Sequence, residues 1–109
     1  MPTPTDSNQQ EWQPIRPELT SGVNGKLLQD GTTKMVLTKV DPGGIFRLHR
    51  DMYGHLIHIL SGEGIFTVEG EEHKLTAGMT LQIQAGSEHG YKNSGQEDLL
   101  MVSVNLVKP

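Results

Sequence analysis

The chain has 109 residues, a formal net charge of −4 at pH 7 and no cysteine. That length builds one domain with a single core, and the acidic balance argues against a nucleic-acid partner. With no cysteine, no disulfide or thiolate site can form, and we expect a cytoplasmic protein with no membrane partner, because no apolar run approaches the roughly 20 residues that span a bilayer.

Residues 1–11 are polar, contain two prolines and are predicted to form a disordered tail. Residues 12–109 are predicted to form the single domain. Within it, residues 12–19 mix apolar side chains with prolines, which predicts an extended arm that docks on the domain. From Val23 onward, short apolar segments alternate with turn signals about every 8–12 residues, which is typical of an all-β sandwich or barrel.

The sequence predicts short strands closed by glycine-containing turns. Asp41-Pro42-Gly43-Gly44 is expected to end one strand, and Gly70 is expected at the bend of a hairpin. No long segment has a 3.6-residue periodicity, so no long helix is predicted. The predicted strands cover residues 34–40, 45–49, 55–60, 65–68, 72–75, 80–84, 89–92 and 98–107.

Histidines and one aspartate are spaced so that a small β-barrel could aim them at one metal ion. His49 and Asp51 lie at i and i+2, which places them on the same face of a strand, because strand side chains alternate with period 2. His55 opens an apolar run, and His89 follows a glycine-containing turn. A buried, hydrogen-bonded polar cluster is the alternative interpretation.

Two motifs carry a family resemblance. The first spans residues 43–62 and the second spans residues 78–93. They resemble the paired motifs of the cupin superfamily, Gly-x5-His-x-His-x3,4-Glu-x6-Gly and Gly-x5-Pro-x-Gly-x2-His-x3-Asn. The resemblance implies a small single-domain cupin, whose all-β barrel is a jelly roll, or double-stranded β-helix.

The resemblance also implies a metal site. His49 occupies the first histidine position and His89 the last, while Asp51 stands where a second histidine is usual. His55 stands where a glutamate is usual, and Gln84 replaces a proline. The implied ligands of one divalent transition metal (Fe, Mn, Ni, Zn or Cu) are therefore three histidines and one aspartate.

The role of Asp51 stays open at this point, because aspartate is shorter than histidine. Its carboxylate either binds the metal, orients a ligand ring from outside, or belongs to a turn, which would leave three histidines and open coordination positions. Period-2 alternation places Ile57 and Ile59 on the face of His55 and places His58 on the opposite face. His73 lies among charged residues and is expected to face solvent.

Arg47 and Tyr91 are the candidate catalytic residues. By the same alternation Arg47 shares the face of His49, where it would bind a carboxylate or phosphate, unless it extends to the barrel mouth. Tyr91 shares the face of His89, as an acid or hydrogen-bond donor or as a core aromatic side chain.

The resemblance implies a metal-dependent enzyme of the dioxygenase, isomerase or lyase type that acts on a small organic molecule. The alternative is a non-catalytic module that binds a small ligand. A homodimer is expected in either case, with the arm and its Trp12 as contacts.

Overall fold

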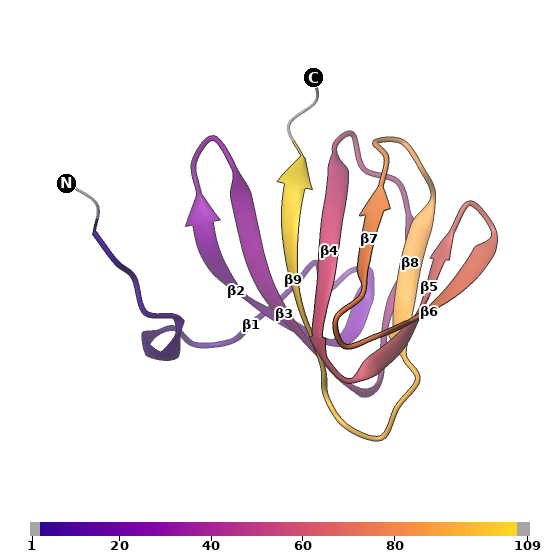
Figure 1. The fold of residues 1–109 in the computed structure, drawn as a ribbon, viewed down its shortest axis with the longest axis horizontal. Coiled ribbons are helices and arrows are strands. Elements are labelled where there is room, and N and C mark those ends of the chain that lie inside the picture. Colours follow the sequence, from indigo (N-terminus) through magenta and orange to yellow (C-terminus); the bar gives the residue numbers. More distant parts are fainter. Residues whose placement is uncertain (1–2, 107–109) are drawn as a thin grey trace.

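The computed structural model describes residues 3–106, which lie mainly in β-strands (Figure 1). The described residues contain no α-helix and no helix long and apolar enough to cross a membrane. The elements are a 3-10 turn η1 (Ser7–Gln9) and strands β1 (Gln13–Pro14), β2 (Thr20–Asp30), β3 (Lys34–His49), β4 (Gly54–Ser61), β5 (Glu63–Val68), β6 (Glu71–Thr76), β7 (Thr80–Ile83), β8 (His89–Asn93) and β9 (Leu99–Leu106). The all-β prediction is confirmed.

The strands form one antiparallel sheet that curls into a nearly closed jelly-roll barrel (Figure 1). Along the sheet the order is β6-β5-β8-β3-β9-β4-β7, and β2 pairs with β3 outside this path. Strands that are neighbours in the sheet are therefore mostly distant in sequence, and loops from distant parts of the chain meet where the Gly86 N–H donates to the Asp51 carbonyl.

Strand β3 differs from the prediction of two strands, 34–40 and 45–49. It continues through the turn signal at 41–44, with Gly43 at φ 79°. Its first half pairs with β9 and its second half with β8. The glycines allow the strand to bend without breaking, and the bend carries His49 across the barrel to pair with His89.

The hairpin between β5 and β6 is confirmed with Gly70 at its bend. Glu69 and Gly70 both have positive φ, 48° and 83°, as a two-residue type I′ turn requires. Glutamate is unusual there, but its Oε2 accepts the Glu88 N–H at 2.5 Å and lies 3.1 Å from Arg50 Nη1. Through the contact with Glu88, the turn stabilises the loop that precedes His89.

The buried apolar side chains form one core inside the barrel. Ile57 and Ile59 are buried, as strand alternation predicts, and Phe66 is fully enclosed. The complete buried apolar set is Val23, Val40, Phe46, Ile57, Ile59, Phe66, Leu75, Ile83, Leu99 and Met101.

The N-terminal arm docks on the barrel as predicted, on the side of β2 (Figure 1). The Trp12 ring contacts the ammonium groups of Lys26 and Lys39, at 4.7 and 4.6 Å from its centroid. The element η1, with Asp6 as its N-cap, lies within residues 1–11, the segment predicted to be disordered. The disorder of this segment stays a prediction. Residues 1–2 of that segment, and 107–109 of the domain and last strand, lie outside the described residues.

Candidate metal centre

Three imidazoles and one carboxylate converge at one end of the barrel. We call His49, Asp51, His55 and His89 the His/Asp cluster. Asp51 Oδ2 lies 2.9 Å from His55 Nε2, 3.1 Å from His49 Nε2 and 3.5 Å from His89 Nε2. The Asp51 side chain is only 7% exposed. All four residues suggested by the sequence are thus brought together.

Close pairing of β3 with β8 sets the first two rings. His49 and His89 are opposite in register, with ring centroids 4.3 Å apart. Phe46 stacks on His49 at 4.5 Å and 17°. Gly90 permits this approach, because a Cβ there would lie 2.6 Å from the Phe46 carbonyl oxygen.

Asp51 does not lie on a strand, so the argument from strand alternation with His49 is wrong. Strand β3 ends at His49, and Asp51 belongs to the loop before β4. The Gly86 N–H donates to the Asp51 carbonyl at 2.8 Å and fixes this loop to the one before β8. The loop supplies the reach that the short aspartate side chain lacks.

The hydrogen bonds of two rings determine where their lone pairs point. His49 Nδ1 donates to the Arg47 carbonyl at 2.8 Å, and His89 Nδ1 donates to the Ser87 carbonyl at 2.9 Å. Carbonyls only accept, so in the neutral rings Nε2 is unprotonated. These lone pairs face Asp51 Oδ2, which also only accepts. A cation between them would satisfy all of these atoms.

Burial and the neighbouring polar groups shift the pKa of Asp51 in opposite directions. Burial alone would raise the pKa of Asp51, but its hydrogen bonds to His55 and Arg16 outweigh burial and lower that pKa. Burial lowers the pKa of His89, which favours its neutral, ligating form. The cluster therefore combines one anion with a neutral imidazole near neutral pH.

The spacing of these atoms matches the edges of a coordination polyhedron. Ligand atoms bound at about 2.1 Å lie about 3.0–3.4 Å apart in octahedral or tetrahedral geometry. The distances from Oδ2 to the imidazole nitrogens, 2.9–3.5 Å, cover this range. In His49, Asp51 and His89, ligand atoms lie within 4.8 Å of one another.

A cupin-domain family model matches residues 36–105, which includes the whole cluster. The protein is a cupin. A comparison with curated proteins finds no match, whereas many solved structures share the fold.

Three solved structures illustrate the likeness. A predicted oxalate decarboxylase from Thermotoga maritima has a TM-score of 0.88 and 23% identity, covering 97% of this chain and 100% of that one. The polyketide cyclase RemF from Streptomyces resistomycificus has a TM-score of 0.88 and 17% identity, covering 99% and 81%. An RmlC-like cupin from Shewanella frigidimarina has a TM-score of 0.80 and 19% identity, covering 93% and 86%. At these identities the likeness establishes the fold.

A cavity of about 140 Å³ opens onto the cluster of this cupin. Two side chains that sequence reasoning missed lie beside it: Arg16, which reaches Asp51, and Tyr53, whose ring meets His55 edge-on at 5.1 Å. The lining residues are Ile15, Arg16, Lys34, Val36, Thr38, Phe46, His49, Asp51, Tyr53, His55, Ser103 and Asn105.

The structure places the candidate catalytic residues away from this cavity. The pairing of β3 with β8 shifts register between Phe46 and His49, so Phe46 faces inward and Arg47 is exposed. Arg47 donates to the Glu18 carbonyl instead. Tyr91 packs against the rings of Phe46 and Phe66, at centroid distances of 5.3 and 4.9 Å, and burial raises its pKa.

The remaining histidines lie outside the cluster, as predicted. His58 hydrogen-bonds to Thr80 at 2.7 Å, and His73, whose side chain is 41% exposed, lies 3.7 Å from a Glu71 oxygen.

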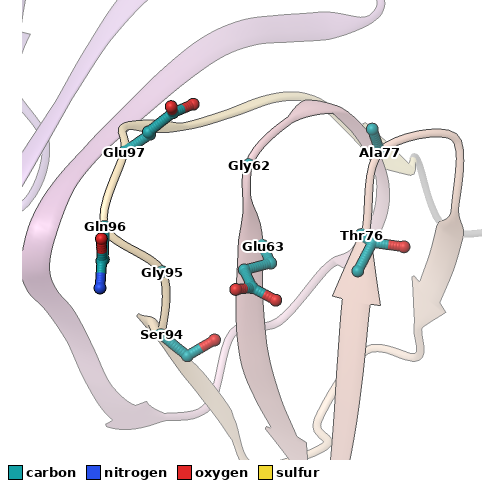
Figure 2. Close-up of a pocket in the computed structure, with 8 residues that line it drawn as sticks. All are labelled: Gly62, Glu63, Thr76, Ala77, Ser94, Gly95, Gln96 and Glu97. Atoms are coloured by element: carbon teal, nitrogen blue, oxygen red, sulfur yellow. The ribbon is translucent and has the colours of Figure 1, made fainter.

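A larger hollow of about 600 Å³ lies beyond the other end of β4, beside Gly62 (Figure 2). Its ionisable side chains are Glu63 and Glu97, and Glu63 pairs with Lys74 at 3.0 Å. It contains no imidazole, so the cluster is the better candidate site.

The substitution Asp51→Asn is expected to lower the free energy of unfolding of the metal-free cupin at pH 7 by about 1–3 kcal/mol, because it leaves Arg16 without its anion. This loss is expected to outweigh the hydrogen bond that the new amide group can donate to an imidazole nitrogen. The pKa of Asp51 is lower in the folded state than its ordinary value of 3.8. Its contribution is therefore present above that value and lost as the pH falls through the folded-state pKa.

Urea unfolding of EDTA-treated protein at pH 7 and at a series of pH values that extends well below 3.8 checks this prediction. Asp30→Asn, at an exposed position, is the control. A difference between wild type and Asp51→Asn that is absent at pH 7, or that grows at low pH, would contradict it.

Proposed function

We propose that the His/Asp cluster binds one divalent transition metal (Fe, Mn, Ni, Zn or Cu) and that the loaded site acts catalytically on a small organic molecule. The observation that carries the proposal is the orientation of imidazole lone pairs toward an acceptor oxygen, Asp51 Oδ2. Imidazole nitrogens together with a single carboxylate suit these metals. When bound, such an ion supplies a Lewis acid that polarises a carbonyl or enolate oxygen.

The chain's own residues divide the remaining tasks around the cavity. Tyr53 is the ionisable hydroxyl beside His55, and burial and the charge of Asp51 raise its pKa, so it keeps its proton and serves as a donor. Val36 and Phe46 supply apolar walls. Tyr53 is thus better placed for acid catalysis than Tyr91 or Arg47, and the reaction class is a dioxygenase, isomerase or lyase type.

Metal content tests the first half of the proposal. Purified wild-type protein is expected to hold close to one metal equivalent, and His49→Ala and His89→Ala are each expected to lose most of it, because each removes one of the four proposed ligands. Elemental analysis measures the content. His73→Ala, at the exposed histidine on β6, is the control and is expected to keep wild-type content. Full metal content in both cluster variants would overturn the proposal.

The alternative function is a binding module that holds the same class of ligand without converting it. The small cavity is compatible with either function. Incubation of metal-loaded protein with short organic acids, sugars and aromatic carbonyl compounds, followed by mass spectrometry, separates the two. Product that disappears on chelation and in His89→Ala is expected for the enzyme. A ligand that binds and is recovered unchanged would establish the module instead.

We also propose that two copies associate through the outer face of β4 and β9. Leu56 and Leu60 are 36% and 46% exposed there, and Leu56 is in register with Val104. Trp12, expected to be a dimer contact, lies on its own barrel between two lysines, so the sheet face is the better candidate surface.

Sedimentation is expected to show a dimer at micromolar concentration, and Leu56→Glu is expected to convert it to a monomer because it places a charge in an apolar contact. Leu48→Glu is the control, since Leu48 is 52% exposed but lies on the half of β3 that pairs with β8. A monomeric wild type, or a dimer unaffected by Leu56→Glu, would contradict the dimer.

A further inference from the structure

The N-terminal arm places the positively charged side chain of Arg16 at the lining of the cavity beside the cluster. Ile15 packs so closely on Gly25 that a Cβ at Gly25 would lie 2.5 Å from Ile15 Cδ1. The Ile15 N–H also donates a hydrogen bond to the Val23 carbonyl at 3.1 Å. The next residue, Arg16, donates from Nη1 to Asp51 Oδ1 at 2.8 Å. Asp51 therefore presents one oxygen to the arm and the other to the imidazoles.

The backbone at Arg16 is held in an unfavourable conformation. Its φ is 42°, in the left-handed region that L residues other than glycine seldom adopt. Arg16 also precedes Pro17, and a proline disfavours the helical region for the residue before it. The Arg16 carbonyl accepts the Leu19 N–H at 2.8 Å, which closes the turn and keeps it in place. Strain of this kind persists where the surroundings over-determine it and is frequent at ligand-binding sites.

The Arg16 guanidinium keeps donors available for a ligand. Nη1 carries two protons and gives one to Asp51, and Nε lies 3.6 Å from Glu18 Oε2. Among residues 3–106, Nη2 has no hydrogen-bond partner, and the side chain is 40% exposed. A guanidinium in this state presents a planar pair of donors, the geometry that a carboxylate matches.

The lining of the cavity is more positive than the whole chain, which carries −4. Arg16 and Lys34 are the cations among its lining residues and Asp51 is the anion, with Glu18 3.6 Å from Arg16 Nε outside the lining. A divalent ion in the cluster would add positive charge. Thr38, Ser103 and Asn105, which carry hydroxyl or amide groups, also line the cavity.

We propose that Arg16 is the anion-binding residue of this site and selects small carboxylates as its ligands, with the carboxylate on the guanidinium and the short carbon chain in the cavity. This inference rests on the proposed metal site for the reacting end of the ligand, but the carboxylate contact itself is made by the chain. The small volume, about 140 Å³, favours ligands of only a few carbon atoms.

Titration with propionate, and with the neutral isostere propionamide, tests the inference. Chemical-shift changes at pH 7.5 report binding to metal-free and to zinc-loaded protein. Wild type is expected to bind propionate more tightly than propionamide in both states. Arg16→Gln is expected to weaken propionate binding by about tenfold or more, the loss typical of one charge-assisted hydrogen-bonded pair, with little effect on propionamide.

Two further variants complete the experiment. Arg16→Lys keeps the charge but loses the planar fork, so its affinity for propionate is expected to lie between those of wild type and Arg16→Gln. Lys74→Gln removes one positive charge beside Glu63, away from the cavity, and is expected to bind propionate like wild type. Circular dichroism verifies that each variant is folded.

Zinc content, measured in every sample, separates this inference from the proposed function. If wild type takes up no zinc yet its metal-free form binds propionate through Arg16, the metal proposal fails and the anion site stands. Propionate affinity that is equal in wild type and Arg16→Gln, or a wild type that prefers propionamide, overturns the anion site whatever the zinc content.

Discussion

At one end of the barrel, imidazole lone pairs converge on a carboxylate oxygen. Two rings give their Nδ1 protons to backbone carbonyls, so their Nε2 atoms face Asp51 Oδ2 as acceptors facing an acceptor. In a buried setting such an arrangement is costly unless a cation joins it. Burial lowers the pKa of His89, so a proton on His89 is disfavoured as the cation that joins these atoms. A metal ion, as proposed above, would satisfy these acceptor atoms.

The barrel is organised to hold these atoms against one another. The bent β3 brings His49 to His89, Gly90 allows the two strands to approach, and the loop after β3 carries Asp51 into the centre. Arg50 donates to the Gly86 carbonyl and to Glu69, joining two loops and a hairpin around the cluster. The cluster thus joins residues 49–55 to the distant His89, while local backbone contacts orient the rings of His49 and His89.

The sequence predicts the all-β barrel and the cluster, because motif spacing fixes which residues meet when the strands pair. It does not predict the face of Arg47, since alternation assumes a regular strand and the pairing shifts register before His49. Arg16 escapes prediction for a different reason. An arm held by one short strand and a strained turn has no periodicity that would indicate where its side chain points.

Anomalous diffraction from crystals of the zinc-loaded protein would locate the ion directly. We expect one ion bound by Nε2 of His49, His55 and His89 and by Asp51 Oδ2, at about 2.0–2.2 Å from each, with Arg16 still on Oδ1. An ion bound elsewhere, or an ion on the three imidazoles with Asp51 turned away, would contradict the assignment of Asp51 as a ligand. A cluster that stays free of zinc at saturating concentration would contradict the metal centre itself.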